Sequence, residues 1–165
     1  MIKHTQSQLY DPAKRKHGSC YPTAIACILN MDVEDVPNFY TLYHWEDKEE
    51  IVKERFRKAF PKVKEGETED RKFWEYRSLW DTVINYWLVA NGYKRSFIGL
   101  MEDGGESYQQ WLKENPDRYY IASGKTVRGT DHVVIYKNGE MIWDPHPDRT
   151  GLETLEDIEF YDKLD

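Results

Sequence analysis

Cysteine is scarce in this chain and basic residues are outnumbered by acidic ones, and each shortage excludes a class of protein. The 165 residues include only two cysteines, Cys20 and Cys27. Both fall on one predicted helix, about 10 Å apart along its axis and beyond disulfide reach, so a disulfide framework is excluded. The formal net charge of −7 argues against a general nucleic-acid surface, which needs an excess of clustered Lys and Arg.

The sequence also lacks long apolar runs and metal-binding motifs. No run approaches transmembrane length and residues 1–4 contain no apolar signal region, so we expect no membrane association and a reducing, cytoplasmic location. The histidines and cysteines do not have zinc-site spacing. Residues 123–126 resemble the end of a phosphate-binding loop, but Tyr119 stands where that motif needs a glycine. We therefore expect neither a metal nor an organic cofactor.

The stretch that organises the chain is residues 18–29, where a polar loop becomes an apolar helix. Cys20 falls in the first turn, where unpaired backbone N–H groups and the positive end of the helix dipole favour a thiolate. Pro22 fits this placement, because proline is tolerated in a first turn. A lone cysteine is more often an ordinary buried residue, and Cys27, in mid-helix among apolar neighbours, fits that structural role.

Hydrophobic periodicity predicts the remaining elements of one domain. Asn30 is the expected end of the first helix, and Ser107 is the expected cap of a short later helix. Further helices are predicted at 46–60, about 72–91 and 107–113, and strands at 94–100, 118–122, 132–137, 140–144 and 158–161. Helices followed by strands predict an α+β fold, with N-terminal helices packed on a mostly antiparallel C-terminal sheet.

Two residues of the predicted hairpin complete a catalytic pattern with the thiol. His132 opens one strand and Asp144 closes the next. A nucleophilic thiol needs a base to accept its proton and a third group to orient that base, and these residue types supply both. Each residue alone would more often be structural. With a thiol at a helix start, they predict a triad of Cys20, His132 and Asp144.

The triad constrains the register of this hairpin. A two-residue turn at Asn138 and Gly139 without any irregularity would place His132 and Asp144 on opposite faces, because side chains alternate along a strand. We therefore expect a three-residue loop, 137–139, that sets Asp144 opposite His132, or another one-residue irregularity between them. His132, Val134, Ile142 and Asp144 would then share a face turned toward Cys20. If Asp144 instead faced away, Asp131 would be the fallback partner of His132.

These residues follow the order found in the papain-like cysteine peptidase superfamily, which the chain resembles: a cysteine at the start of a central helix, a histidine on one strand, and Asn or Asp on the next. It is more closely similar to a group of small phage and bacterial proteins. The shared motifs read Gly18-Ser19-Cys20, Ala26-Cys27-Ile28-Leu29, Val36-Pro37-Asn38-Phe39, His132-Val133-Val134, Gly139, Asp144-Pro145-His146-Pro147 and Gly151-Leu152. Ser19 stands where the group often has Asn or Asp, and residues from about 40 to 105 have no counterpart.

The resemblance implies a single papain-like domain over residues 1–165, with a helical insertion at about 40–105. It also implies an oxyanion hole built from the Cys20 backbone N–H and an upstream glutamine amide. The group's opening motif points to Gln6. Gln8 is the runner-up, because both glutamines would face the same side of a strand.

Together these features predict a cysteine-dependent hydrolase or acyltransferase that acts on an amide, isopeptide or ester bond and needs no cofactor. The phage resemblance implies a substrate in a host protein or peptide, and the host cytosol as the location. The alternative is a catalytically idle papain-like fold that binds or inhibits a host protein through its acidic, aromatic surface. The sequence leaves the oligomeric state open.

Overall fold

The structure is a computed structural model that describes residues 1–14, 16–42, 51, 54–55, 58, 79–101 and 103–165. The chain forms two compact units. One comprises Met1–Pro37 and Ser96–Tyr161, and the other comprises Asn38–Arg95 and Asp162–Asp165. The triad residues all belong to the first unit. The expectation of one domain with an insertion at about 40–105 stays a prediction.

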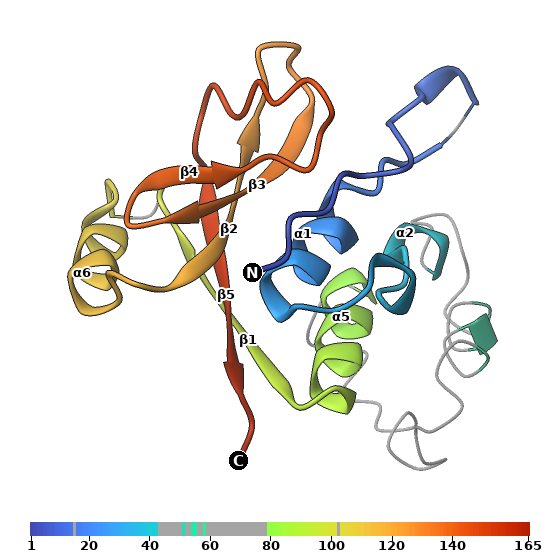
Figure 1. The fold of residues 1–165 in the computed structure, drawn as a ribbon, viewed down its shortest axis with the longest axis horizontal. Helices are drawn as coiled ribbons and strands as arrows, with labels where there is room; N and C mark the ends of the chain where they lie inside the picture. The colour runs from blue at the N-terminus through green and yellow to red at the C-terminus, as the bar shows by residue number, and fades with distance from the viewer. Residues whose placement is uncertain (15, 43–50, 52–53, 56–57, 59–78, 102) are drawn as a thin grey trace. The chain divides into compact units, whose positions relative to one another are not determined.

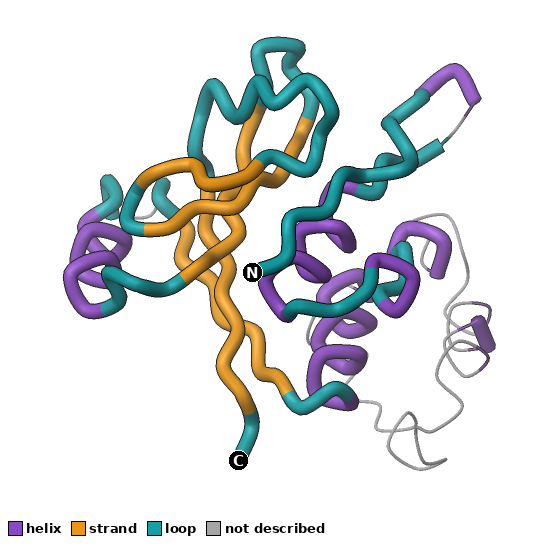
Figure 2. Tube along the Cα trace, viewed as in Figure 1, coloured by secondary structure: helices purple, strands orange, loops and turns teal. Residues whose placement is uncertain are grey.

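The helix that carries Cys20 forms as predicted. Helix α1 (Cys20–Leu29) begins at the cysteine and ends at Asn30, whose left-handed conformation (φ 56°) closes the helix. Its residues from Tyr21 to Cys27 are buried, and the helix packs against strands β2 (Tyr119–Lys125) and β3 (Asp131–Lys137). Before it, the described residues are loop apart from the short helix η1 (Pro12–Lys14) and an isolated β-bridge between Asp11 and Lys16 (Figure 2).

A five-stranded sheet follows the first helices and confirms the α+β prediction (Figure 1). The strand order is β1-β5-β2-β3-β4, and β2 pairs antiparallel with both β3 and β5, as β3 does with β4. The strands are β1 (Tyr93–Gly99), β2 (Tyr119–Lys125), β3 (Asp131–Lys137), β4 (Glu140–Trp143) and β5 (Asp157–Lys163). Each lies within a few residues of its predicted position, because strand and turn residues are locally distinct in this part of the chain.

The turn of the β3–β4 hairpin differs from the prediction. Lys137 pairs with Glu140, which leaves a two-residue loop of Asn138 and Gly139. Both loop residues have positive φ, 51° and 78°, as a type I′ turn requires. The three-residue loop expected at 137–139 is therefore wrong. Asn and Gly both tolerate positive φ, and this favours the tighter turn.

The irregularity that the triad requires lies further along the hairpin. Ile135 pairs with Trp143 and not with Ile142, so Ile142 is an extra residue on β4. The predicted one-residue irregularity between His132 and Asp144 is confirmed, although its position is new. It restores the alternation that brings these two side chains to one side of the hairpin.

One part of the core of the first unit lies between the sheet and helix α6 (Glu106–Glu114), and the buried residues of α1 form another. Tyr108 and Trp111 of α6 pack on four buried strand residues, Tyr120, Ala122, Val134 and Ile158. Val134 thus belongs to the cluster under α6, so the expected row of four side chains facing Cys20 is wrong. In Figure 1, α1 and α6 lie on opposite sides of the sheet.

The start of α6 also corrects a prediction. Gly105 is the N-cap residue, and Ser107 lies inside the helix. The capping carboxylate is that of Asp103, which accepts hydrogen bonds from the N–H groups of Gly105 and Ser107, each at 2.9 Å. An acidic residue two positions before the cap performs the role that the pattern assigned to serine.

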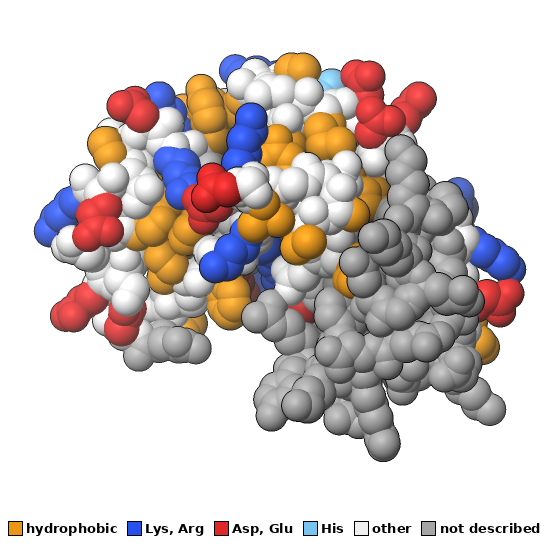
Figure 3. All heavy atoms as spheres, turned by 90° about the horizontal axis from the view of Figure 1, so that it is seen from below, with side chains coloured by type: hydrophobic (Ala, Val, Ile, Leu, Met, Phe, Trp, Pro, Cys, Tyr) orange, Lys and Arg blue, Asp and Glu red, His pale blue; other side chains and the backbone are white. Residues whose placement is uncertain are grey.

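The second unit contains helices α2 (Phe39–Leu42) and α5 (Leu79–Ala90). Phe39 packs edge-on against Trp87 of α5, with ring centroids 5.8 Å apart. The described part of the helix predicted at 72–91 is therefore confirmed from residue 79. The helix predicted at 46–60 lies mostly outside the described residues. On the face drawn in Figure 3, acidic, basic and hydrophobic side chains are interspersed.

Candidate active site

Cys20 is the first residue of α1, and it is partly buried. The side chain of Ser19 bonds the backbone of Gln8 instead of capping the helix, and the Ser19 N–H donates to the Gln8 carbonyl at 2.9 Å. First-turn N–H groups have no partner within a helix. The Cys20 N–H is therefore one of the donors that the helix start leaves beside the thiol.

His132 and Asp144 form a buried pair next to this thiol. Nε2 of His132 lies 2.7 Å from Oδ1 of Asp144, and only 6% and 1% of the two residues are exposed. Because Asp144 occupies Nε2, Nδ1 is the ring nitrogen left for Cys20, whose side chain lies close enough to raise the pKa of His132. The structure thus brings the predicted thiol, imidazole and carboxylate together in that order.

The surroundings of the imidazole favour its protonated form. Burial alone lowers the pKa of His132, but the hydrogen bond with Asp144 and the electrostatic effect of the nearby Cys20 and Asp144 side chains raise it to about 9. Burial likewise opposes ionisation of Asp144, yet hydrogen bonds from His132 and from two backbone N–H groups lower the pKa of that carboxyl. At neutral pH, an imidazolium therefore lies between a carboxylate and a sulfur, which suits a thiol nucleophile.

This raised pKa predicts a pH-dependent stability. Below pH 6.5, His132 is protonated in both the folded and the unfolded chain, and its contribution is fully present. As pH rises toward about 9, the unfolded chain loses the proton first, so the free energy of unfolding falls. We expect a loss of up to about 3 kcal/mol by urea unfolding across this range. In Cys20→Ala, His132 keeps only Asp144 as a partner, so its pKa should be raised less and the free energy of unfolding should fall over a narrower pH range. An unchanged pH dependence of stability would contradict the interaction between Cys20 and His132.

Both carboxylate oxygens of Asp144 are fixed by the loop that follows β4. Oδ1 accepts the His146 N–H at 2.8 Å, and Oδ2 accepts the Gly151 N–H at 2.9 Å. The first bond is an Asx turn, in which a side chain binds the backbone two residues on. The carboxylate therefore cannot rotate away from His132 without losing backbone hydrogen bonds.

Arg149 holds this loop against the N-terminal arm. Its guanidinium donates to the carbonyl of Asp144, to the carbonyl of His146 at 2.9 Å and to Thr5 Oγ1 at 2.6 Å. It also stacks on the Trp143 ring, 3.8 Å from the centroid. One side chain thus links the two segments that carry Asp144 and Gln6, far apart in sequence.

Gln6, the predicted oxyanion donor, is buried beside this loop. Its backbone N–H donates to the Pro145 carbonyl at 2.9 Å, and its Nε2 donates to the Gln8 carbonyl at 3.0 Å. A Cβ added at Gly18 would lie 3.7 Å from this Nε2, so the amide approaches the loop that leads to Cys20. One of the two Nε2 hydrogens is taken by Gln8, and the second remains for a ligand.

The structure separates the alternative residues from the site. The side chain of Gln8 donates to the His17 carbonyl at 2.5 Å and so holds the loop before α1. Asp131 is ion-paired with Lys125, and 82% of its side chain is exposed. Cys27 is fully buried, and burial raises the pKa of its thiol. These positions agree with structural or surface roles.

Sequence reasoning missed the second imidazole of this loop. The His146 and His132 rings lie edge-on with centroids 5.8 Å apart, and Asp148 pairs with His146. The sequence did contain a signal for an ordered loop. The Asp144 side chain accepts the backbone N–H of His146, two residues on, and the Asp148 side chain likewise accepts that of Thr150. Two consecutive Asx turns indicate a compact, ordered loop.

Among the described residues, no group of three or more His, Cys, Asp or Glu side chains could hold a metal ion. Within the same part of the chain, no helix has the length and apolar character needed to span a membrane. Comparisons of the chain with protein-family models, with curated proteins and with solved structures found no match, so its papain-like resemblance stays a prediction based on motifs.

Proposed function

We propose that the protein is a cysteine-dependent hydrolase or acyltransferase that acts on an amide, isopeptide or ester carbonyl. The observation that carries this proposal is the buried position of His132 between two partners. Its Nε2 bonds Asp144 at 2.7 Å, and its other nitrogen is left for the Cys20 thiol. A purely structural histidine would need neither a thiol partner nor a fixed ring orientation.

In the proposed reaction, the proton of the Cys20 thiol resides on His132, as the raised pKa of that imidazole favours, and the thiolate attacks the substrate carbonyl. Asp144 keeps Nε2 protonated and stabilises the imidazolium. The Cys20 N–H and the free hydrogen of the Gln6 amide are the candidate oxyanion donors. His132 then passes its proton to the leaving group, and water or another nucleophile releases the acyl group. This chemistry requires no metal or organic cofactor.

The papain-like resemblance extends the proposal to the substrate. If the chain acts as its phage counterparts suggest, the bond lies in a host protein or peptide and the reaction takes place in the host cytosol. This extension depends on motif similarity, whereas the reaction class depends on the site.

Selective alkylation tests the reaction class directly. We expect iodoacetamide to modify Cys20 about 100-fold or more faster than Cys27 at neutral pH, because Cys20 lies beside an imidazolium, whereas Cys27 is fully buried with a raised pKa. Peptide mapping by mass spectrometry against time and pH measures both rates in the same sample.

The His132→Ala variant is the control for this experiment. It should slow the alkylation of Cys20 and leave Cys27 unchanged. Equal rates at the two cysteines of the folded protein would overturn the proposed nucleophile. A reactive Cys20 with no acyl transfer to any ester or amide would instead favour the idle, partner-binding alternative.

A further inference from the structure

A second imidazole–carboxylate pair lies directly beside the first. Nδ1 of His146 is 2.6 Å from Oδ1 of Asp148, and the His146 ring stands edge-on to the His132 ring, with centroids 5.8 Å apart and planes at 87°. The side chain of His146 is 20% exposed, so a ligand has access to it. The mechanism described above gives this pair no role.

The carboxylate of Asp148 is held in its ionised form. Arg128 pairs with one oxygen, while the other accepts the N–H and the hydroxyl of Thr150 at 3.2 and 3.1 Å. Burial opposes ionisation of this carboxyl, but the bonds with Thr150, Arg128 and His146 hold the pKa of Asp148 well below its usual range. The backbone N–H of Asp148 also lies 3.2 Å from Nδ1, but the closer carboxylate requires a proton there. The neutral His146 ring therefore presents a lone pair at Nε2.

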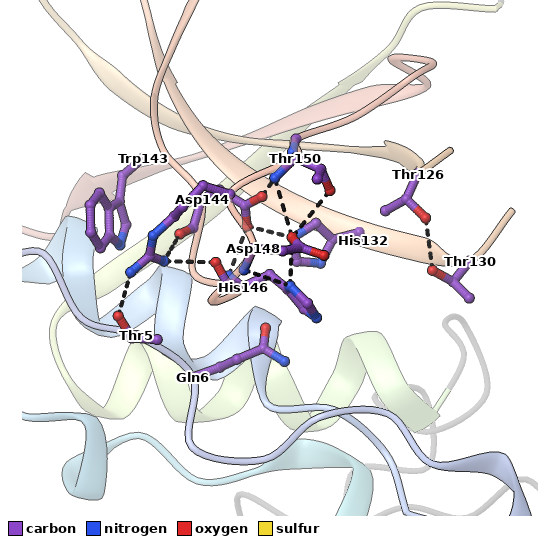
Figure 4. Close-up of polar contacts among 12 residues, drawn as sticks. Thr5, Gln6, Thr126, Thr130, His132, Trp143, Asp144, His146, Asp148 and Thr150 are labelled. Carbon is purple, nitrogen blue, oxygen red and sulfur yellow. Dashed lines mark hydrogen bonds and ion pairs between the residues drawn. The ribbon is translucent and has the colours of Figure 1, made fainter. Parts of the chain in front are cut away.

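Gln6 supplies a second acceptor on this side of the site. In Figure 4 the His146 ring lies between the Asp148 carboxylate and the Gln6 amide. Gln6 is only 6% exposed, and its Oε1 is buried without a hydrogen-bond partner among the described residues. Reversing the amide would place Oε1 against the Gln8 carbonyl, so its orientation is fixed. Two acceptors without a donor indicate a ligand group that donates hydrogen bonds.

We propose that His146 Nε2 accepts the N–H of a scissile amide, so that the site favours amides and isopeptides over esters. This inference rests on the proposed function of Cys20. In acylation, the Cys20 sulfur bonds the carbonyl carbon, the C–N bond breaks, and the His132 proton moves to the nitrogen, which leaves as an amine. Water then hydrolyses the thioester to an acid and restores the thiol. Holding the N–H at His146 turns the nitrogen lone pair toward His132, which must protonate it.

The test uses three substrates that share an N-acetylglycyl group: the 4-nitroanilide, its N-methyl derivative and the 4-nitrophenyl ester. Only the first has an N–H at the scissile bond. His146→Phe keeps a ring against His132 and removes the acceptor. We expect it to lower kcat/KM for the anilide about 10- to 100-fold and to change that for the ester less than about 3-fold. The wild-type protein should disfavour the N-methyl compound by a similar factor.

Asp148 is a positioning residue in this proposal. Asp148→Asn should lose the single Nδ1–H tautomer of His146, visible in the ¹⁵N shifts of its ring, and should lower anilide turnover more than ester turnover. Asp131→Asn is the matched control, because it removes an exposed carboxylate at the start of β3. It should leave both readouts unchanged.

Several outcomes would overturn the inference: equal losses for anilide and ester in His146→Phe, equal turnover of anilide and N-methyl anilide, ester turnover without anilide turnover, or a wild-type His146 protonated at Nε2 alone. If no substrate is turned over, the ¹⁵N tautomer still decides whether His146 is an acceptor. Failure of the proposed function is recognised separately, because Cys20 would then show no selective alkylation.

Discussion

Replacing His132 with alanine is expected to lower kcat/KM by about 10⁴- to 10⁶-fold, the range for losing one member of a nucleophile–base pair. The imidazole both takes the thiol proton and returns it to the leaving group, so no neighbouring side chain replaces it. His146 lies beside His132, with ring centroids 5.8 Å apart, but its Nδ1 is paired with Asp148 and not with the thiol. Hydrolysis of N-acetylglycyl 4-nitroanilide, corrected for the rate with Cys20→Ala, gives the measurement, because its leaving nitrogen needs the proton that His132 returns.

The same variant has a cost in stability that must be measured beside the activity. Removing one partner of a buried charged pair costs about 3–5 kcal/mol, because Asp144 is left without its imidazolium. The two backbone N–H groups that Asp144 retains should reduce this loss. Circular dichroism identifies the temperature at which both proteins are folded, and Asp131→Asn serves as the neutral control. A loss of activity below about 10-fold in folded protein would remove His132 from the mechanism.

The parts of the site that were predicted from sequence depend on local signals. The helix begins at Cys20 and ends at Asn30 because proline in the first turn and an asparagine at the C-terminus act within a few residues. His132 and Asp144 were predicted from residue type and strand position. Their contact at 2.7 Å then follows from the requirement that both side chains lie on one side of the hairpin.

The position of the bulge could not be predicted in the same way. Alternation along the strands requires one extra residue between His132 and Asp144, but it does not say where. Asn138 and Gly139 satisfy the type I′ turn, so the extra residue moves to Ile142 on β4. The choice between these places depends on how the hairpin packs in the folded protein, which a pattern of alternating residues does not record.

Other features of the site depend on contacts between segments far apart in the sequence, which local patterns do not reveal. Glu159 is buried on β5, where Tyr21, next to the predicted nucleophile, donates to it at 2.6 Å, and Tyr161 donates to the same oxygen. The first of these bonds spans 138 residues. In the sequence, Glu159 is one acidic residue among many, and nothing near it indicates burial. It anchors the start of α1 to the sheet and so helps to fix Cys20.

Gly124 has a structural role, although the segment that contains it superficially resembles a phosphate-binding loop. It pairs with His132 in the sheet. The chain before β5 crosses it closely: the N–H of Glu153 donates to the Lys125 carbonyl at 2.7 Å, and that of Glu156 donates to the Ser123 carbonyl at 2.9 Å. The glycine allows this close approach of two backbones.

We therefore expect Gly124→Ala to destabilise the fold by about 3 kcal/mol or more. An added Cβ would overlap the Thr154 carbonyl oxygen and lie 2.8 Å from its carbon, and both atoms belong to backbone held by hydrogen bonds to β2. Relief requires moving β2, whose Gly124 pairs with His132 of β3, or the segment that crosses it, so activity should fall together with stability. Urea unfolding measures the loss, with Ser123→Ala as a control that adds no atom on the same strand. A loss below about 1 kcal/mol in Gly124→Ala would mean that the backbone at Thr154 moves away from the added Cβ at little cost. The close approach of this segment to β2 would then not help to hold His132 in place.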